Sequence, residues 1–198
     1  MKLIGLTGGA GSGKSTVGGM FRELGAAIVD ADEASHAVYA TGNPGFDAVV
    51  AEFGSDVVRN GQIDRAKLGE LVFHDESARR RLNAIVHPLV REWMAARTAE
   101  ADRDGSSVVI HDVPLLFENG LEPLYSDVVL VYVPPRVQLR RLVDGRGLSQ
   151  ELARSIIAAQ MPIDEKRSRA QHVVDNSGDR DKTRAQVEKL WADISPAR

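Results

Sequence analysis

Short, continuously apolar runs alternate along the chain with longer segments whose apolar residues recur every three or four positions. Runs rich in Val, Ile and Leu are typical of parallel strands that are covered on both faces. We therefore expect a strand in each of these ranges: 2–7, 26–32, 106–113, 127–133 and 172–176. Strands that alternate with helices predict an α/β fold, with right-handed crossovers, a parallel β-sheet and helices on both faces.

Two of the helical segments can be placed from their patterns. A helix is expected near residues 16–24, directly after a glycine-rich stretch. From Leu82 to Met94 the apolar residues keep helical spacing, but Pro88 interrupts them. Because proline disfavours helical geometry at the preceding residue, we predict a break at His87 and a new helix that starts at Pro88.

The alternation is interrupted twice by helical segments. Residues about 34–100 lie between the second and third expected strands, and residues about 135–170 precede the last one. A chain of 198 residues suits one domain with appendages. We therefore predict a single domain whose core comprises residues about 1–33, 101–134 and 171–198.

Composition excludes several classes of protein. The 25 Lys and Arg residues against 28 Asp and Glu residues lack the basic excess of proteins that coat nucleic acid. Cysteine is absent, which excludes disulfides and thiolate metal sites. The apolar opening is too short for a signal peptide or a membrane span. We expect a cytoplasmic protein with no nucleic acid and no membrane among its partners, and a monomer, although the sequence leaves an oligomer open.

The stretch LTGGAGSGKSTVG follows the first expected strand and matches a phosphate-loop motif. Gly8, Gly13, Lys14 and Ser15 fit the pattern G-x-x-x-x-G-K-[ST] between a strand and a helix, which is the context the motif requires. Glycines let the backbone approach phosphate oxygens, so that successive amides and the helix N-terminus face the anion. We expect Lys14 to reach the β- and γ-phosphates of a nucleotide and the Ser15 hydroxyl to bind Mg²⁺.

Three classes of protein use such a loop. A GTPase switch needs a guanine-reading Asn-Lys-x-Asp, which is absent, and the Asp-x-x-Gly of residues 102–105 precedes a strand instead of following one. A nucleotide-binding module without turnover shares the loop, and the sequence leaves that class open. A small-molecule kinase predicts two further features: a carboxylate beside the loop and a mobile arginine-rich lid.

A carboxylate pair follows the second expected strand. Asp30 and Asp32 come at its carboxyl end, where ligands of parallel sheets bind. One of the two suits the N-cap of the next helix. We favour Asp32 as the group that accepts the proton of the acceptor hydroxyl, or that orients this hydroxyl in line with the γ-phosphate.

An arginine-rich segment supplies the candidate lid. Residues 135–170 contain these arginines: Arg136, Arg140, Arg141, Arg146, Arg154, Arg167 and Arg169. Guanidinium groups chelate phosphate oxygens and neutralise the charge of the transferring group. We interpret Arg136, Arg154 and Arg169 as solvated helix residues. Arg141 and Arg146 flank the turn VDGRG and are predicted to bind phosphates when the lid closes and excludes water.

Together these stretches resemble the dephospho-CoA kinases, nearly end to end. The likeness is carried, in order, by LTGGAGSGKSTV, VDAD, IVHP, DVPLLFE, the QLRRL…GLS…AAQ of the lid, and DNSG. It implies a P-loop kinase core with a helical substrate-binding insertion (about 34–100) and a lid (about 135–170). It also implies transfer of the γ-phosphoryl group of ATP to the 3′-hydroxyl of dephospho-CoA, the last step of coenzyme A synthesis, with Mg²⁺. Another small-molecule kinase, of the nucleoside monophosphate or shikimate type, is the alternative.

The resemblance also assigns roles to residues. ATP would be bound by Gly8, Gly9, Gly11, Ser12, Gly13, Lys14, Ser15, Thr16 and, near its adenine, Asn176. Catalysis would fall to Lys14, Asp32, Arg141 and Arg146. The acceptor would contact Asp32, His87, Leu115, Leu116 and Phe117. Three alternatives stay open: His87 as a cap of the helix break, the Leu-Leu-Phe run as ordinary core, and Asn176 as a turn residue.

Two positions depart from the pattern of the family. Many relatives carry an arginine four residues after the position of Arg141. Here that position is Gly145 and the arginine is Arg146, so the residue that fills this lid role stays open. The third expected strand contains His111 where an apolar residue is expected. We interpret His111 as a strand-end residue and Asp112 as a candidate to orient Mg²⁺ through water.

Overall fold

The strands follow the predicted alternation. The computed structural model describes residues 1–195, apart from the side chain of His74, so the end of the predicted core segment 171–198 lies outside the described residues. The strands are β1 (Lys2–Gly8), β2 (Ala27–Asp30), β3 (Val58–Arg59), β4 (Gln62–Ile63), β5 (Val108–Asp112), β6 (Asp127–Tyr132) and β7 (His172–Asp175). All the predicted strands are confirmed, and β3 and β4 form a separate antiparallel hairpin.

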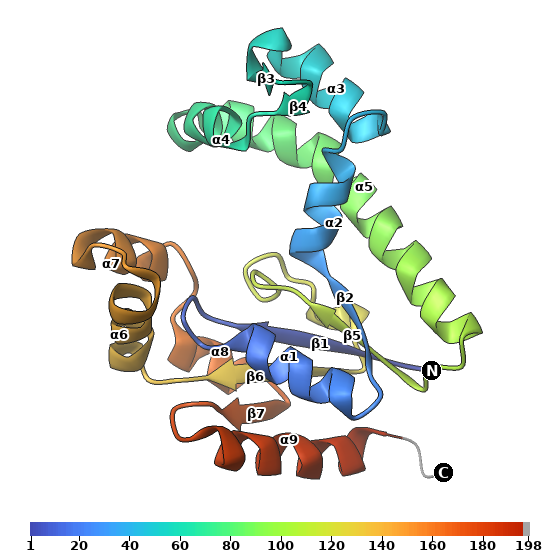
Figure 1. Cartoon of the computed structure of the whole chain (residues 1–198), viewed down its shortest axis with the longest axis vertical. Helices are drawn as coiled ribbons and strands as arrows, with labels where there is room; N and C mark the ends of the chain where they lie inside the picture. Colours follow the sequence, from blue (N-terminus) through green and yellow to red (C-terminus); the bar gives the residue numbers. More distant parts are fainter. Residues whose placement is uncertain (196–198) are drawn as a thin grey trace. The chain divides into compact units, whose positions relative to one another are not determined.

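One five-stranded sheet forms the centre of the fold (Figure 1), and within the described residues its order is β2-β5-β1-β6-β7. β1 pairs in parallel with β5 and with β6, and β6 pairs in parallel with β7. The α/β fold is therefore confirmed. In the register of β1 and β5, Leu6 lies opposite Asp112, so the residues that follow β1 emerge at the same edge of the sheet as the end of β5.

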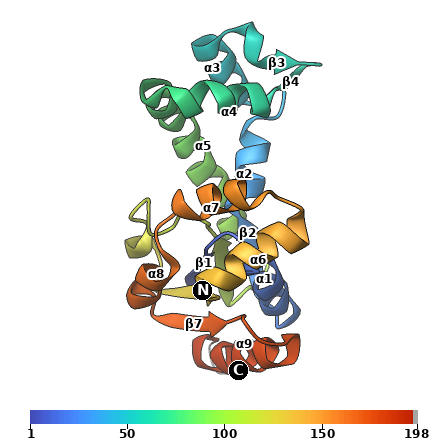
Figure 2. The ribbon, with the colours of Figure 1, turned by 90° about the vertical axis from the view of Figure 1, so that its left-hand side faces the viewer.

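Helices cover both faces of this sheet. The helices are α1 (Lys14–Glu23), α2 (Ala31–Val38), α3 (Pro44–Phe53), α4 (Arg65–His74), α5 (Glu76–Arg103), α6 (Pro135–Arg146), α7 (Gln150–Ala158), α8 (Ile163–Arg169) and α9 (Arg180–Ile194), with 3₁₀ turns at Ser55–Val57 and Glu122–Leu124. α1 and α9 pack against each other on one face (Figures 1 and 2). α8 packs on the other face, against β6.

Alternation along the strands explains this layering. On the face under α1 and α9, the buried residues of the core include Ile4, Leu6, Val108, Ile110, Val129, Val131 and Val174. Leu130 and Tyr132 alternate with the β6 members of that set and contact Ile163 of α8. Successive side chains of a strand point to opposite faces, so a strand covered on both sides needs an unbroken apolar run.

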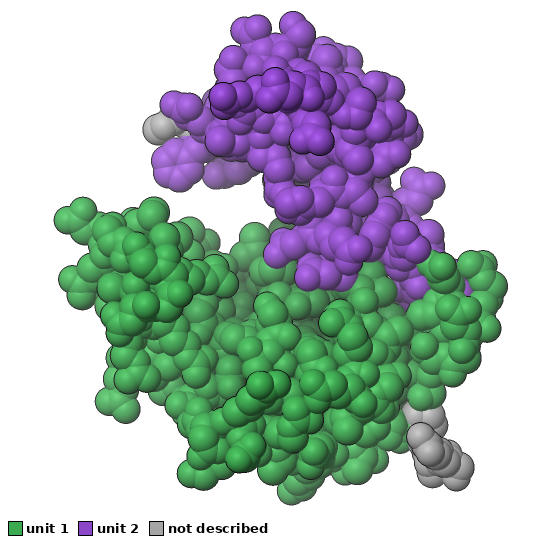
Figure 3. Space-filling model, in the orientation of Figure 1, with its two compact units in different colours: residues 1–29, 100–198 green, residues 30–99 purple. Residues whose placement is uncertain are grey.

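The chain divides into two compact units, coloured separately in Figure 3: residues 1–29 with 100–198, and residues 30–99. The first unit holds the sheet. The second is helical, with the β3–β4 hairpin, and has a core of its own made of Val38, Val49, Val57, Ile63, Leu68, Leu82 and Val86. Within residues 1–195, none of the helices is both long enough and apolar enough to cross a bilayer.

The predicted break at His87 is wrong, because α5 runs through Pro88 without interruption. Proline removes one N–H from the helix and leaves the carbonyl of the residue four positions earlier without its donor. That residue, Ala84, is exposed, as are His87 and Pro88, so water can solvate the freed carbonyl. Leu82 and Val86, before the proline, share one core with residues after it, and this common apolar stripe keeps the helix continuous.

The predicted turn VDGRG is also displaced. α6 continues through Gly145 to Arg146 and ends only at Gly147, which has a φ of 66°. The N–H of Gly147 donates to the carbonyl of Val143 (3.0 Å), and the next N–H donates to the carbonyl of Leu142 (3.3 Å). This is the hydrogen-bonding pattern of a glycine-terminated helix, in which the left-handed residue follows the last helical turn. Arg146 is therefore the last residue of a helix.

Candidate active site

The loop between β1 and α1 presents its amides as an anion site. Gly11 and Gly13 have φ values of 75° and 84°, in the left-handed region that favours glycine. The N–H of Ser12 donates to the carbonyl of Gly9 at 3.0 Å. Within residues 1–195, four amides of the loop and the first turn of α1 have no hydrogen-bond partner: those of Gly11, Gly13, Lys14 and Ser15. Free N–H groups at a helix N-terminus attract phosphate through hydrogen bonds and the helix dipole.

Lys14 adds a cation to this site. Its ammonium forms an ion pair with Asp112, the last residue of β5, and both side chains are largely buried. The parallel pairing of β1 with β5 positions the two groups, since it sets Asp112 opposite Leu6, two residues before the loop begins. The pair balances the lysine charge within the protein.

The carbonyl groups of the same loop are held by side chains from distant elements. Gln138 of α6 donates its side-chain N–H to the carbonyl of Ala10 (2.8 Å), and Asn176 donates to that of Ser12 (2.7 Å). Arg141 donates to the carbonyls of Ser12 (3.2 Å) and Asn176 (2.7 Å). Because the carbonyls are bound on the outer side, the peptide planes are fixed with their N–H groups free for a ligand.

The loop glycines also make room for these side chains. A Cβ on Gly9 would lie 2.2 Å from the side-chain nitrogen of Gln138, and one on Gly13 would lie 2.2 Å from that of Asn176. A Cβ on Gly11 would lie 2.8 Å from the backbone oxygen of Gln138. A side chain at position 11 would therefore meet backbone of α6, whereas one at position 9 or 13 would displace the Gln138 or Asn176 side chain that binds the loop.

Two glutamines at Ala10 were not predicted from the sequence. Gln138 binds its carbonyl, and the side-chain oxygen of Gln160 accepts its N–H at 2.8 Å. Both glutamines belong to stretches that carry the family resemblance, QLRRL and AAQ, but the sequence assigned them no role. Gln138 is only 2% exposed within an otherwise arginine-rich helix, but this burial is seen only in the structure, and the sequence carries no signal of it.

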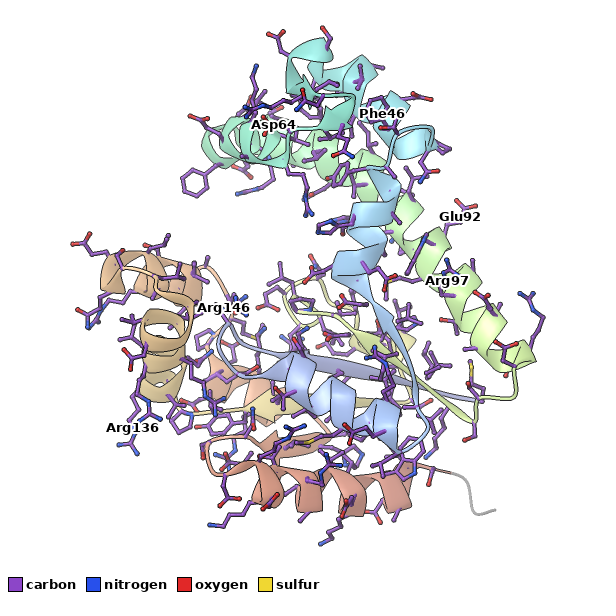
Figure 4. All side chains as sticks on the ribbon, viewed as in Figure 1. Phe46, Asp64, Glu92, Arg97, Arg136 and Arg146 are labelled. Atoms are coloured by element: carbon purple, nitrogen blue, oxygen red, sulfur yellow. The ribbon has the colours of Figure 1, made fainter. Side chains whose placement is uncertain are left out.

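The two candidate lid arginines differ in their surroundings. Arg141 is half-buried and bound to the loop, as described above. Arg146 is exposed at the end of α6, and Arg136 is exposed near its start (Figure 4). Arg141 therefore contacts the loop that would hold the phosphates, whereas Arg146 lies at the free end of the helix.

Asn176 lies beneath the loop and is buried. Its side-chain nitrogen donates to Ser12, and its side-chain oxygen accepts the hydroxyl of Thr183 at 3.0 Å. Both polar ends of the side chain are therefore engaged by the protein. In this structure Asn176 supports the loop, a role that sequence reasoning did not consider.

The second unit contains Asp32. Asp30 is the N-cap of α2, and its carboxylate accepts the N–H of Asp32 at 2.7 Å. The prediction that one of the pair caps the helix is confirmed, and Asp30 is that residue. Asp32 is exposed in the first turn, and within residues 1–195 its carboxylate has no hydrogen bond or ion pair. It is therefore available to a ligand.

The remaining acceptor candidates lie in different settings. His87 is exposed in the middle of α5, where the helix is continuous, so the alternative in which it caps a helix break is wrong. Leu116 and Phe117 are buried, at 0% and 2% exposure, whereas Leu115 is 40% exposed. Of this run, Leu115 offers its side chain to solvent.

His111 lies next to the last residue of β5, as a strand-end residue, and its ring is buried. It lies edge-on to the ring of Tyr125, with the ring centroids 5.6 Å apart. Burial lowers the pKa of His111 to about 4 and raises the pKa of Tyr125 to about 12. Both side chains are therefore neutral near pH 7.

The residues at the loop fit a magnesium ion that arrives with a nucleotide. The Ser15 hydroxyl and the Asp112 carboxylate are the oxygen donors that Mg²⁺ prefers. In the part of the chain that the structure describes, no group of three or more His, Cys, Asp or Glu side chains gathers to hold a metal. Nucleotide-bound Mg²⁺ keeps several waters and takes phosphate ligands, so it needs few protein groups.

Comparison with known proteins gives consistent matches. The family model described as dephospho-CoA kinase matches residues 2–182. The dephospho-CoA kinase of Geobacillus kaustophilus is 50% identical over 185 residues, which cover 93% of this chain and 92% of the relative. A solved structure from Thermus thermophilus has a TM-score of 0.80 at 32% identity and covers 98% of both chains. Dephospho-CoA kinase from Campylobacter jejuni has a TM-score of 0.72 at 25% identity and covers 98% of this chain and 96% of its own.

Proposed function

Because the chain belongs to the dephospho-CoA kinase family, we propose that it transfers the γ-phosphoryl group of ATP to the 3′-hydroxyl of dephospho-CoA, giving coenzyme A and ADP. The observation that supports this proposal is the loop itself, in which N–H groups without partners in residues 1–195 lie beside Lys14 at the N-terminus of α1, an arrangement that suits a triphosphate. The choice of acceptor rests on the family.

The residues of the loop would bind the triphosphate of ATP. Gly8, Gly9 and the segment 11–16 supply backbone amides and room, and Lys14 supplies the charge. As phosphate binds, Lys14 would turn from Asp112 towards the β- and γ-oxygens. Arg141, which donates to the carbonyls of Ser12 and Asn176, would contact phosphate oxygens through its remaining N–H groups, and Arg146 would join it only if the end of α6 moves.

Asp32 would act on the acceptor. The transition state of phosphoryl transfer is loose, so orienting the 3′-hydroxyl in line with the γ-phosphate contributes more than full removal of its proton. The exposed carboxylate of Asp32 can accept a hydrogen bond from that hydroxyl and receive its proton as the new bond forms. His87 and Leu115 are the further acceptor contacts that we propose, with Leu116 and Phe117 supporting Leu115 from the core.

Mg²⁺ would be held by the Ser15 hydroxyl, with Asp112 oriented towards it through water. When bound, the ion neutralises charge on the β- and γ-phosphates. Asn176 would contribute to nucleotide binding by supporting the loop, with its side chain near the adenine as the finer proposal. We further propose a cytoplasmic monomer whose partners are these two small molecules, without nucleic acid or membrane.

The test is a product assay by mass spectrometry. The purified protein is incubated with Mg·ATP and dephospho-CoA, with AMP and shikimate in parallel reactions and Lys14→Ala as the inactive control. One phosphoryl group added to dephospho-CoA alone, with a ³¹P signal of a ribose 3′-monoester, is the expected result. Phosphorylation of AMP or shikimate instead would indicate another class of small-molecule kinase. Binding of ATP without any phosphorylated product would indicate a nucleotide-binding module without turnover.

A further inference from the structure

Lys166 of α8 is a fully buried lysine that the proposed reaction does not use. Its side chain is 0% exposed, and its ammonium lies 2.7 Å from a carboxylate oxygen of Glu118. The ammonium also donates to the carbonyl of Pro114 at 3.2 Å. Burying a charge is costly unless it is paired and hydrogen-bonded, so this arrangement requires a specific partner.

The same two partners are tied to further elements. The carbonyl of Pro114 also accepts the hydroxyl of Thr7, in β1, at 3.2 Å. The oxygen of Glu118 that faces Lys166 also accepts the N–H of Met161 at 2.9 Å. Lys166 and Glu118 therefore join three segments: the end of β1, the loop after β5, and the connection between α7 and α8.

The connection between α7 and α8 extends this junction to the phosphate loop. Gln160 accepts the N–H of Ala10 at 2.8 Å, and its neighbour Met161 donates to Glu118. One dipeptide thus contacts the phosphate loop on one side and the loop after β5 on the other. The loop after β5 begins beside Asp112, the partner of Lys14, and contains Leu115.

We propose that Lys166 and Glu118 are positioning residues that hold the loop after β5 in its position relative to the phosphate loop. The proposal rests on the proposed function, since it assigns Leu115 and its loop to the acceptor. The second carboxylate oxygen of Glu118 is buried and has no hydrogen-bond partner within residues 1–195. Glu118 therefore depends on Lys166 for charge compensation, and the loss of Lys166 displaces the loop and not only its own side chain.

The chain supplies a matched control between the same segments. Arg169, also in α8, pairs with Glu122 just after the loop, but its side chain is 38% exposed and that of Glu122 is 23% exposed. Pairs that solvent reaches contribute little. Arg169→Met removes an ion pair between the same elements without leaving a buried charge unpaired. Val187→Ala, at a residue of α9 that is buried in the core, controls for lost stability alone.

The experiment compares kcat, KM for dephospho-CoA and Kd for ATP in Lys166→Met, Glu118→Gln and the two controls. Because small displacements at a reacting centre can cost up to about 10²-fold in rate, we expect Lys166→Met to lower kcat at least about tenfold and to raise KM for dephospho-CoA. Kd for ATP should change less than about threefold, as the N–H groups of the phosphate loop are untouched. Arg169→Met and Val187→Ala should keep kcat within about threefold of wild type.

The double variant Lys166→Met/Glu118→Gln distinguishes the effect of an unpaired charge on Glu118 from the effect of losing the lysine side chain. Both charges are then absent, while the glutamine side chain introduced at position 118 can still accept the N–H of Met161. We expect kcat to recover above that of Lys166→Met. A double variant no better than the single one would overturn the proposal, and so would wild-type kinetics for Lys166→Met. If Val187→Ala lost as much kcat as Lys166→Met at an equal Tm, lost stability would explain the effect, and the proposal would be overturned. If Lys166→Met does not fold, Glu118→Gln and the double variant provide the same comparison.

Hydrogen exchange tests the junction without any acceptor. In Lys166→Met, the amide of Met161 should exchange at least about tenfold faster than in wild type, because its acceptor is no longer held. Unchanged exchange would overturn the proposal even if turnover fell. If wild type failed to phosphorylate dephospho-CoA, the proposed function would fail, and the exchange result would still decide whether the junction exists.

Discussion

The phosphate loop of the first unit and the start of α2 in the second unit hold their candidate reactive groups in opposite ways. Around the loop, Gln138, Gln160, Arg141 and Asn176 fix the peptide planes from three other elements. Asp32 is exposed in a first helical turn, and the cap that Asp30 provides is its fixed neighbour. The loop is thus held by side chains of the protein itself, whereas the start of α2 presents the exposed carboxylate of Asp32.

This difference predicts how substitutions divide between binding and turnover. Changes at the loop should impair ATP binding and turnover together, because we propose that the same groups contact the phosphates before and during transfer. Changes at Asp32 should impair turnover alone, since its proposed contact is with the acceptor hydroxyl.

Lys14→Ala should have the largest effect. Removing the cation takes away electrostatic stabilisation that grows as charge develops on the transferring group, so kcat/KM should fall by about 10³-fold, with weaker ATP binding. Steady-state kinetics and calorimetric titration of ATP measure the two quantities. Lys182→Ala, at a lysine side chain that is 79% exposed on α9, is the control and should behave as wild type. Intact binding and turnover in Lys14→Ala would refute the role of the loop.

Asp32→Asn should lower kcat by about 10²-fold while Kd for ATP barely changes. The amide cannot accept the proton, but its size keeps the geometry of the turn. Asp30→Asn is the matched control, because asparagine is as good an N-cap as aspartate and α2 should begin as before. Near wild-type kcat in Asp32→Asn, or an equal loss in Asp30→Asn, would move the acceptor role elsewhere.

His111 should make the first unit sensitive to acid. Its pKa of about 4 in the folded state lies below its ordinary value of 6.5, so the unfolded chain binds a proton that the folded chain does not. Folding stability should therefore fall as the pH drops from 6.5 towards 4, by about 2 kcal/mol between pH 7 and pH 5.

Urea unfolding at pH 7 and pH 5 measures this loss. His111→Gln should lose less stability than wild type over the same interval. His87→Gln, at an exposed histidine of the second unit, leaves the buried ring in place and should show the wild-type difference. Parallel behaviour of His111→Gln and wild type would contradict the prediction.

The elements that sequence predicted well are those determined locally. The strands of the sheet are continuous apolar runs, and the loop is a short glycine pattern between a strand and a helix, so neighbouring residues contain the information. The Asp30 cap is similarly local, although the sequence did not distinguish it from Asp32.

The side chains that bind the phosphate loop could not be predicted in the same way. Gln138 and Gln160 reach Ala10 from 128 and 150 residues away along the chain, and each contact depends on how α6 and α7 pack. A glutamine in a helix carries no local signal of such a partner. The same holds for the buried pair of Lys166 and Glu118, because Lys166 lies in a stretch rich in charged residues that carries no local sign of burial.

Pro88 of α5 shows the converse error. The local rule that proline interrupts a helix is valid, but packing overrules it here. Replacing this proline gives the smallest predicted effect. Pro88→Ala returns an N–H that can donate to the carbonyl of Ala84, and alanine is favoured over proline in a helix interior by about 3 kcal/mol. Part of that gain is lost, because alanine also frees the unfolded chain and water already solvates the carbonyl. The second unit should be stabilised by about 1 kcal/mol.

Urea unfolding measures the gain, and kcat serves as the control. Unchanged kcat is expected, since α5 already continues through position 88. A loss of kcat without loss of stability would show that the proline, beside His87, shapes the acceptor side after all.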